Sequence, residues 1–386
     1  SRIGVTKLAG YKYDHGEKQQ AKMYLDEAIR YYKMMIDPKV SGSGSRNGWI
    51  PETFGREVQE LCCTTDMIEL ASELVKCYDF GEDYTELLKL HDDIESMSVN
   101  WLARIQLTMS DEFKQYISKY WPNYDERYIK RLNDYDGIFF ATPSPNDLIR
   151  PYNGKINIHL GMCCPYAATR VLYNIWQSIA YDEQDVLKVN ILLTLDRDFV
   201  KIESKMPVSG YSSVMPKKDY KQVMIRVPSF TQASAMKLTV KGKKVRPSID
   251  KTGQYLVLDN VKANQKIEIK YPATETITKR TLAHRPITMK WVGNYVTELS
   301  PKGSDFPVFP GKSYYEFYDG KEYGYGFLSE TAKKSDKKVK QKFGTDGQPI
   351  LVKDEEGSFD TVKWVRLDLG KSVKIDEVVV YPADPI

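Results

Sequence analysis

The periodicity of the apolar residues changes near Val186, and this change constrains the fold more than any other feature of the chain. Before it, apolar residues recur at the i, i+3 and i+4 spacing of amphipathic helices. From Val186 the run Val-Leu-Lys-Val-Asn-Ile-Leu-Leu-Thr-Leu is rich in β-branched residues and has a short period, which favours strands. The sequence therefore predicts an α-helical part over residues 1–181 and a β-rich part after it.

The helical part is expected to contain several helical segments, over about 16–36, 64–78, 84–107 and 110–133, the last with an interruption at Trp121-Pro122-Asn123. One further helix is expected over about 165–181. A long loop is expected over 134–160, because this stretch carries Pro143, Pro145, Pro151 and Gly154.

Short strands with alternating sides are expected from 182 to 310, at the spacing of about 8–12 residues that is typical of a β-sandwich. The candidates are 186–195, 198–204, 221–227, 236–240, 254–258, 265–271, 286–291 and 294–299. Residues 311–386 are expected to form a third part of the chain, a β-rich tail whose Lys-rich run is a solvated loop. The fold class predicted is thus α+β with more than one domain, which suits a length of 386 residues.

Charge and hydropathy exclude some classes of protein. The 56 Lys and Arg nearly balance the 52 Asp and Glu, which argues against a dedicated nucleic-acid binder. No apolar stretch approaches the roughly 18 residues that a membrane-spanning helix needs, so we expect a soluble protein. The sequence opens Ser-Arg-Ile-Gly without a visible signal peptide. We expect either that a signal peptide was removed or that this chain is a piece of a longer protein.

Two vicinal cysteine pairs carry the clearest chemical signal. Cys163 and Cys164 precede Pro165, which is favoured at the first helical position, so Cys164 is expected at the N-cap. A helix N-terminus favours thiolate over thiol, and thiolates are both nucleophiles and zinc ligands. The alternative is that two small apolar residues simply cap a core helix. Five cysteines, few and odd in number, do not suggest a disulfide framework.

The second pair lies in Glu60-Leu61-Cys62-Cys63, which also precedes a helical run. Glu60 and Cys62 can converge on one ion only if Glu60 still lies in the turn before the helix. With Cys163 and Cys164 they would supply one carboxylate and three thiolates, a donor set that zinc accepts, although the spacing is not that of a zinc finger. Cys77, within a helical run, is expected in the core.

Carboxylates cluster in the same region at Glu52, Glu57 and Glu60. Glycoside hydrolysis uses two groups that flank the scissile bond, one of them an acid with a raised pKa. Glu52 lies between Trp49-Ile50-Pro51 and Thr53-Phe54-Gly55, an aromatic setting that suits such an acid. The alternative is an ordinary solvated loop glutamate.

Several motifs in order along the chain resemble glycoside hydrolase family 127, the β-L-arabinofuranosidases of bacteria that degrade plant glycans. The similarity covers about residues 16–310. The motifs are Glu52-Thr-Phe-Gly, Glu60-x-Cys62, Gly137-Ile-Phe-Phe, Cys163-Cys164-Pro165, Lys188-Val-Asn-Ile-Leu-Leu, Met224-Ile-Arg-Val-Pro-Ser-Phe and Trp291-Val-Gly-Asn-Tyr-Val-Thr-Glu-Leu-Ser-Pro-Lys-Gly.

This resemblance implies the C-terminal part of an (α/α)6 barrel followed by β-sandwich domains, the remaining barrel helices preceding Ser1. It implies a retaining glycosidase in which Cys163 is the nucleophile and Glu60, Cys62, Cys163 and Cys164 hold Zn²⁺. Glu52 would be the general acid/base. The substrate would be a plant oligosaccharide or polysaccharide, and the location periplasmic or secreted.

Some assignments stay open at this point. The spacing from Glu52 to Glu60 is shorter than in characterised members of the family, so Glu57 is a rival for the acid/base. His159, four residues before Cys163, is a candidate for substrate binding or an ordinary loop histidine. The segment from about Thr361 to Pro382 resembles part of a discoidin-type carbohydrate-binding module, or is another sheet edge.

Two other functions fit the same residues. The chain could be a non-catalytic glycan-binding or scaffold protein in which the zinc is structural. A thiol redox protein is the weaker alternative, because the sequence has no Cys-x-x-Cys motif.

Overall fold

The computed structural model describes residues 2–37, 45–50, 59–107, 110–120, 136–148, 150–152, 155–157, 163–282, 285–303 and 308. All of them lie within one unit of the chain, Ser1–Asp336. The expected tail over 311–386, with its discoidin-like segment, lies outside the described residues.

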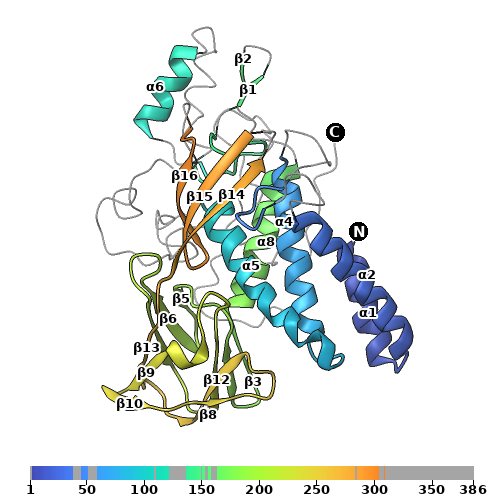
Figure 1. Ribbon diagram of the computed structural model, residues 1–386, viewed down its shortest axis with the longest axis vertical. Coiled ribbons are helices and arrows are strands. Elements are labelled where there is room, and N and C mark those ends of the chain that lie inside the picture. Colours follow the sequence, from blue (N-terminus) through green and yellow to red (C-terminus); the bar gives the residue numbers. More distant parts are fainter. Residues whose placement is uncertain are drawn as a thin grey trace, which may run out of the picture. The chain divides into compact units, whose positions relative to one another are not determined.

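The described α-helices all precede the two larger sheets along the chain, as the sequence predicts (Figure 1). The expected helix over 16–36 is present and buries Ala21, Leu25 and Ala28 along one face. The segment expected as one helix over 84–107 is instead divided into a 3-10, an α- and a π-helical part. The described helices are α1 (Arg2–Asp14), α2 (Lys18–Ile36), α4 (Leu61–Leu74), η1 (Val75–Cys77), η2 (Glu82–Lys89), α5 (Leu90–Met97), η3 (Ser98–Leu102), α6 (Asp111–Tyr120), α8 (Cys163–Ile179) and η5 (Ala233–Ala235).

Two larger sheets follow α8. A six-stranded sheet has the order β10-β9-β13-β7-β6-β5, and a five-stranded sheet has the order β11-β12-β8-β4-β3, in which β4 and β8 are parallel. The strands are β3 (Ala180–Glu183), β4 (Val186–Val189), β5 (Leu195–Asp196), β6 (Val200–Ser204), β7 (Tyr211–Pro216), β8 (Tyr220–Arg226), β9 (Lys237–Val240), β10 (Lys243–Val245), β11 (Ser248–Ile249), β12 (Tyr255–Val261) and β13 (Ile267–Lys270).

Two smaller antiparallel sheets complete the described part. One contains β14 (Glu275–Leu282), β15 (Arg285–Val292) and β16 (Tyr295–Ser300). The other pairs β1 (Arg150–Tyr152) with β2 (Lys155–Asn157), inside the stretch expected to be a loop. The change from helix to strand, expected near Val186, occurs at Ala180, where β3 begins directly after α8.

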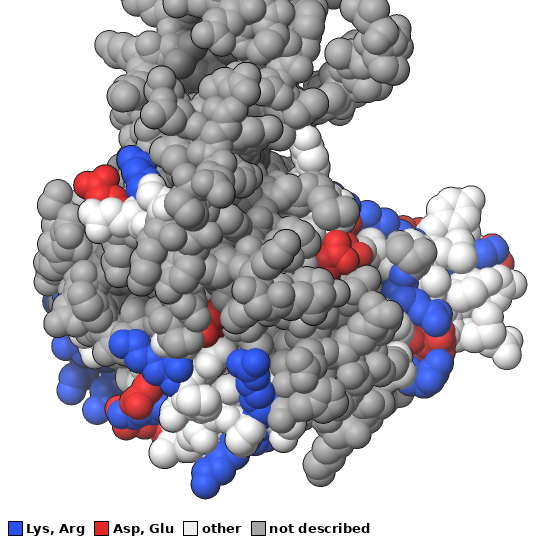
Figure 2. Space-filling model, turned by 90° about the horizontal axis from the view of Figure 1, so that it is seen from above, with Lys and Arg blue, Asp and Glu red and all other residues white. Residues whose placement is uncertain are grey.

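Two surface properties of the described residues bear on the expected class of protein. None of the described helices has the length and apolarity needed to cross a membrane. On the face seen in Figure 2, the described basic and acidic side chains lie next to one another. This mixture agrees with the near balance of charges in the sequence.

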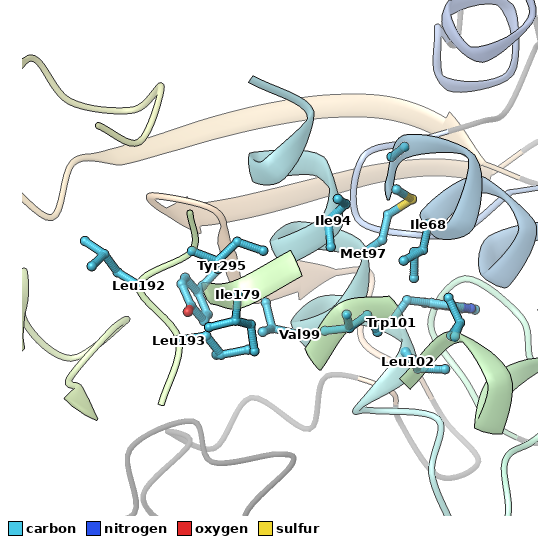
Figure 3. Close-up of a cluster of buried hydrophobic side chains, with 14 of the residues drawn as sticks. Ile68, Ile94, Met97, Val99, Trp101, Leu102, Ile179, Leu192, Leu193 and Tyr295 are labelled. Carbon is cyan, nitrogen blue, oxygen red and sulfur yellow. The ribbon is translucent and has the colours of Figure 1, made fainter. Parts of the chain in front are cut away.

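One hydrophobic core joins the helices to the strands. Figure 3 shows side chains from α4, α5, η3 and α8 meeting Leu192, Leu193 and Tyr295, which come from the β-rich part. Trp101, Ile179 and Tyr295 are completely buried there. The helical part and the sheets are therefore packed as one body through shared apolar side chains.

A buried ion pair lies beside this core. Arg226 at the end of β8 is 1% exposed and Asp92 of α5 is 0% exposed. The Nη1 and Nη2 atoms of Arg226 donate to the two oxygens of Asp92 at 3.0 and 2.7 Å. Ser229 donates to the same carboxylate through its backbone N–H and its hydroxyl, and Asn294 donates through its amide. The buried carboxylate thereby accepts five hydrogen bonds, which offset the cost of burying its charge.

The same network ties the last sheet to the helices. Glu95 of α5 accepts hydrogen bonds from Asn294 and Tyr295, both at 2.8 Å. Asn100 in η3 donates to the carbonyl of Asn294 at 2.7 Å. The turn between β15 and β16 is thus anchored by polar contacts as well as by the buried ring of Tyr295.

His91, next to Asp92, makes the stability of the fold dependent on pH. Burial, together with the nearby Arg226 charge, lowers the pKa of His91 to about 3. Between pH 6.5 and 3 the unfolded chain binds a proton that the folded protein excludes. His91 should therefore reduce the free energy of unfolding by about 1.4 kcal/mol for each pH unit lost in that window. Urea unfolding measured at several pH values tests this.

The matched comparison is His91→Gln, which removes the titrating group. Burial raises the pKa values of Asp93 and Glu95 nearby, which acts in the opposite direction, but both groups are common to the two proteins. The difference between the two pH profiles therefore isolates His91. Parallel profiles would show that His91 does not titrate as described.

Candidate metal centre

The structure brings together the four residues expected to bind zinc. The ligand atoms of Glu60, Cys62, Cys163 and Cys164 all lie within 4.8 Å of one another. The Sγ atom of Cys62 is 3.2 Å from that of Cys163 and 3.5 Å from that of Cys164. The Oε1 atom of Glu60 is 3.2 Å from Sγ of Cys163 and 3.5 Å from Sγ of Cys164. Two segments about one hundred residues apart thus converge on one point.

The backbone at the start of α4 explains how Glu60 and Cys62 reach the same point. Glu60 is the N-cap residue and has extended backbone angles, φ −111° and ψ 134°. It makes no side-chain capping hydrogen bond, so its carboxylate is directed toward the cysteines and not toward its own helix. This is the geometry that the sequence requires if Glu60 and Cys62 are to bind one ion.

Helix α8 delivers the other pair. It packs beside α4, and Arg170 of α8 forms ion pairs with Asp66 and Glu69 of α4 at 3.0 and 2.9 Å. The helix begins at Cys163, so Pro165 lies within its first turn. The prediction that Pro165 is the first helical residue and Cys164 the N-cap is therefore wrong. Cys163 is exposed, whereas Cys164 is buried. The two neighbouring thiols therefore differ in their access to a ligand from outside.

The segment around Gly137-Ile-Phe-Phe contacts both the start of α4 and the second cysteine pair. Gly137 has φ +88°, a conformation that favours glycine, and its N–H donates to the carbonyl of Leu107. A little further on, the carbonyl of Ala141 accepts the N–H of Leu61, the first residue of α4, at 2.8 Å. The same carbonyl lies 4.0 Å from Sγ of Cys164. This motif thus fixes the start of α4 relative to the second cysteine pair.

The donor set fits a tetrahedral zinc ion. With Zn–S bonds of about 2.3 Å, a regular tetrahedron has sulfur–sulfur edges of about 3.8 Å. The two shortest distances between sulfur atoms, 3.2 and 3.5 Å, lie below this value, and the largest separation among the four ligand atoms is no more than 4.8 Å. A ligand set of three thiolates and one carboxylate also suits zinc better than it suits magnesium or calcium, which prefer oxygen ligands.

The electrostatics of the cluster favour a cation as well. Burial and the hydrogen-bonded sulfurs around it raise the pKa of Cys62 far above that of an ordinary thiol. Burial raises the pKa of Cys164 to about 12. At Cys62 and Cys164, burial therefore outweighs the effect of a helix N-terminus that favours the thiolate. Their ionisation at neutral pH requires a positive charge within the cluster.

The remaining predicted residues are distributed differently. Glu52, Glu57 and His159 lie outside the described residues, as does the whole Glu52-Thr-Phe-Gly motif. Cys77 is buried in η1, as expected of a core residue. The ion pair of Asp92 and Arg226 was not predicted, although the run His91-Asp92-Asp93 inside an apolar helical pattern was a signal for it.

Comparisons with known proteins find matches among solved structures. No family model matches the sequence, and no curated protein matches it either. The structure is similar to that of a GH127 beta-L-arabinofuranosidase from Geobacillus stearothermophilus T6, with 14% identity and a TM-score of 0.46. This match covers 76% of this chain and 45% of that one.

Two further solved structures show the same kind of likeness. One, described as a glycoside hydrolase, has 14% identity and a TM-score of 0.38, covering 62% of this chain and 37% of that one. A GH127 beta-arabinofuranosidase has 13% identity and a TM-score of 0.37, covering 77% and 55%. The chain thus spans about half the length of these proteins or less.

Proposed function

We propose that this chain carries the nucleophile and metal ligands of a retaining glycoside hydrolase that acts on plant-derived glycans, with β-L-arabinofuranosides as the first candidate substrates. The observation that supports this best is the convergence of Glu60, Cys62, Cys163 and Cys164 at the N-termini of two packed helices. The motifs that resemble glycoside hydrolase family 127 supply the substrate class. In this proposal the described helices belong to an (α/α)6 barrel and the two larger sheets form a β-sandwich.

The four residues would hold Zn²⁺, which when bound keeps the sulfurs deprotonated at neutral pH and so offsets the raised pKa values of Cys62 and Cys164. Cys62 and Cys164 are the less accessible ligands. Cys163 is the exposed one, and its sulfur is therefore the one that a sugar can approach.

The reaction would proceed in two steps at Cys163. In the first, its thiolate bonds to the anomeric carbon while the glycosidic carbon–oxygen bond breaks, and the carboxylic acid of Glu52 gives its proton to the leaving oxygen. In the second, water attacks the anomeric carbon, the Glu52 carboxylate takes a proton from that water, and the carbon–sulfur bond breaks. The thiolate and the carboxylic acid are both regenerated, and the anomeric configuration is retained.

Turnover of an aryl β-L-arabinofuranoside by the wild-type protein tests this function. We expect about one zinc per chain by elemental analysis and release of the aryl group with retention of configuration in the first-formed sugar. Prolonged chelation should remove both the zinc and the turnover. Binding of arabinofuranosides without hydrolysis would instead identify a non-catalytic glycan-binding protein in which the metal is structural.

The acid/base role is tested by chemical rescue. Glu52→Ala should lose most of its turnover of natural glycosides, because no group protonates the leaving oxygen or activates water. Azide, a small nucleophile that needs no general base, should restore part of the turnover of an activated aryl glycoside and leave the glycosyl azide as product. Glu57→Ala is the matched control and should need no rescue. Rescue of Glu57→Ala, and not of Glu52→Ala, would move the role to Glu57.

A further inference from the structure

A cavity of about 510 Å³ lies away from the cysteine cluster, at the other end of the same two helices. It forms where the last residues of α4 and α8 meet β3 and β12. Ser72 and Tyr173, which line it, each follow a cysteine of the cluster by ten residues on one helix, a separation of about 15 Å. The cavity is therefore a separate site.

The walls of this cavity combine aromatic rings with amides. Four tyrosines and three amide side chains line it: Tyr78, Tyr173, Tyr181, Tyr255, Asn174, Gln177 and Asn190. Several of these groups are already held in place. The hydroxyl of Tyr255 donates to Asn190 at 2.7 Å, and the amide of Gln177 donates to the hydroxyl of Tyr173 at 3.0 Å. The polar groups are thus positioned before any ligand arrives.

One wall residue has an unused hydrogen-bonding atom. His91 lines the cavity and is only 4% exposed, and its Nδ1 atom has no hydrogen-bond partner among the described residues. Because the pKa of His91 is lowered to about 3, the ring is neutral at pH 7 and offers no charge.

The charged groups around the cavity are already paired or placed against rings. Lys76 and Glu73 form an ion pair at 2.8 Å. Lys188 does not line the cavity, but its ammonium lies 5.7 and 5.4 Å from the ring centres of Tyr78 and Tyr181, where cation–π attraction holds it. No unbalanced charge among the described lining residues favours an ionic ligand, so the site suits a neutral one.

We propose that this cavity binds a neutral saccharide of one or two sugar rings. Tyrosine faces pack against the C–H faces of a sugar, while amides and a neutral imidazole pair with its hydroxyl groups. The volume lies within the range of about 300–1,000 Å³ found for small-ligand pockets. This site would hold glycan at the end of α4 and α8 opposite the cysteine cluster, and it stands whether or not that cluster is catalytic.

The test uses the full chain, with the His91 ring as the reporter. The sequence has only four histidines, so the nitrogen resonances of His91 can be assigned by comparison with His91→Gln. The probes are the methyl glycosides of L-arabinose, D-xylose, D-galactose and D-glucose. At least one of them should shift the His91 resonances in a saturable manner, with a dissociation constant in the millimolar range or below.

Variants of exposed or half-buried residues of α8 keep the test free of unfolding. Tyr173→Ala combined with Gln177→Ala should weaken binding of that glycoside about tenfold or more, since it removes one aromatic face and one amide. Tyr11→Ala on α1, where the tyrosine is 56% exposed, is the matched control and should bind as the wild type does. Absence of any saturable shift, or equal affinity of the double variant and the wild type, would overturn the proposal. A cysteine variant that has lost turnover should still show the saturable shift of the His91 resonances, so failure of the proposed function and failure of this proposal can be told apart.

Discussion

Cys163→Ala is expected to lower the turnover of an aryl β-L-arabinofuranoside by about a thousandfold or more, because the variant has no atom to bond to the anomeric carbon. The helix that carries it should remain folded, since Cys163 is exposed at the first residue of α8 and its side chain contributes nothing to the core. Initial rates with and without the substitution, at equal zinc content, measure the effect.

Cys63→Ala provides the control for this result. Cys63 is adjacent to Cys62 but does not belong to the group of four, so its loss should leave turnover close to that of the wild type. Mass spectrometry of the wild-type enzyme, quenched during turnover, should also find one glycosyl group on the peptide that contains Cys163. Full turnover in Cys163→Ala, or a glycosyl group on another residue, would remove the nucleophile from this position.

The sequence predicts the candidate site better than it predicts the fold around it. Spacing alone required Glu60 to lie before its helix if it was to meet Cys62, and the extended N-cap conformation of Glu60 satisfies that condition. Local rules are sufficient here, because N-caps and helix starts are determined by a few neighbouring residues. The roles of these residues in binding metal and in catalysis stay predictions.

Elements that depend on distant partners were the ones that the sequence did not reveal. Helix α1 contains Gly4 and Gly10, which are poor helix formers, and it is stabilised by packing against α2 and α4. Strand β14 exposes nearly all of its residues, so it lacks the alternation by which a strand is found, and its pairing with β15 determines it. In both cases tertiary contacts outweigh local preference.

The division of the expected helix over 84–107 has a similar origin. Ser98 donates its hydroxyl to the carbonyl of Ile94 at 2.5 Å, which competes with the regular helical pattern. Asn100, in the π-helical turn, accepts the N–H of Val296 at 2.7 Å from a strand almost two hundred residues away. Apolar periodicity does not record such polar contacts, and for the same reason it did not reveal the pair of Asp92 and Arg226.

Asp92→Ala is expected to destabilise the fold by about 3–5 kcal/mol, because it leaves the guanidinium of Arg226 buried without a counter-charge. Burial alone would raise the pKa of Asp92, but the Arg226 charge and the hydrogen bonds from Ser229 and Asn294 outweigh it and hold the pKa well below its usual range. The ionised form is therefore the one that folding favours. Its contribution should be complete above about pH 4 and decline as the pH falls further. The midpoint of urea unfolding at pH 7 measures the loss.

Two further variants separate the buried charge from other effects of the substitution. Asp66→Ala removes an acid that is 56% exposed and paired with Arg170, and it should cost no more than about 1 kcal/mol. Asp92→Leu combined with Arg226→Met removes both buried charges and should be more stable than Asp92→Ala, although Ser229 and Asn294 lose their acceptor. If the double variant were no more stable than Asp92→Ala, the uncompensated charge of Arg226 would not be the cause, and the loss would have to come from the three hydrogen bonds that Ser229 and Asn294 donate to Asp92.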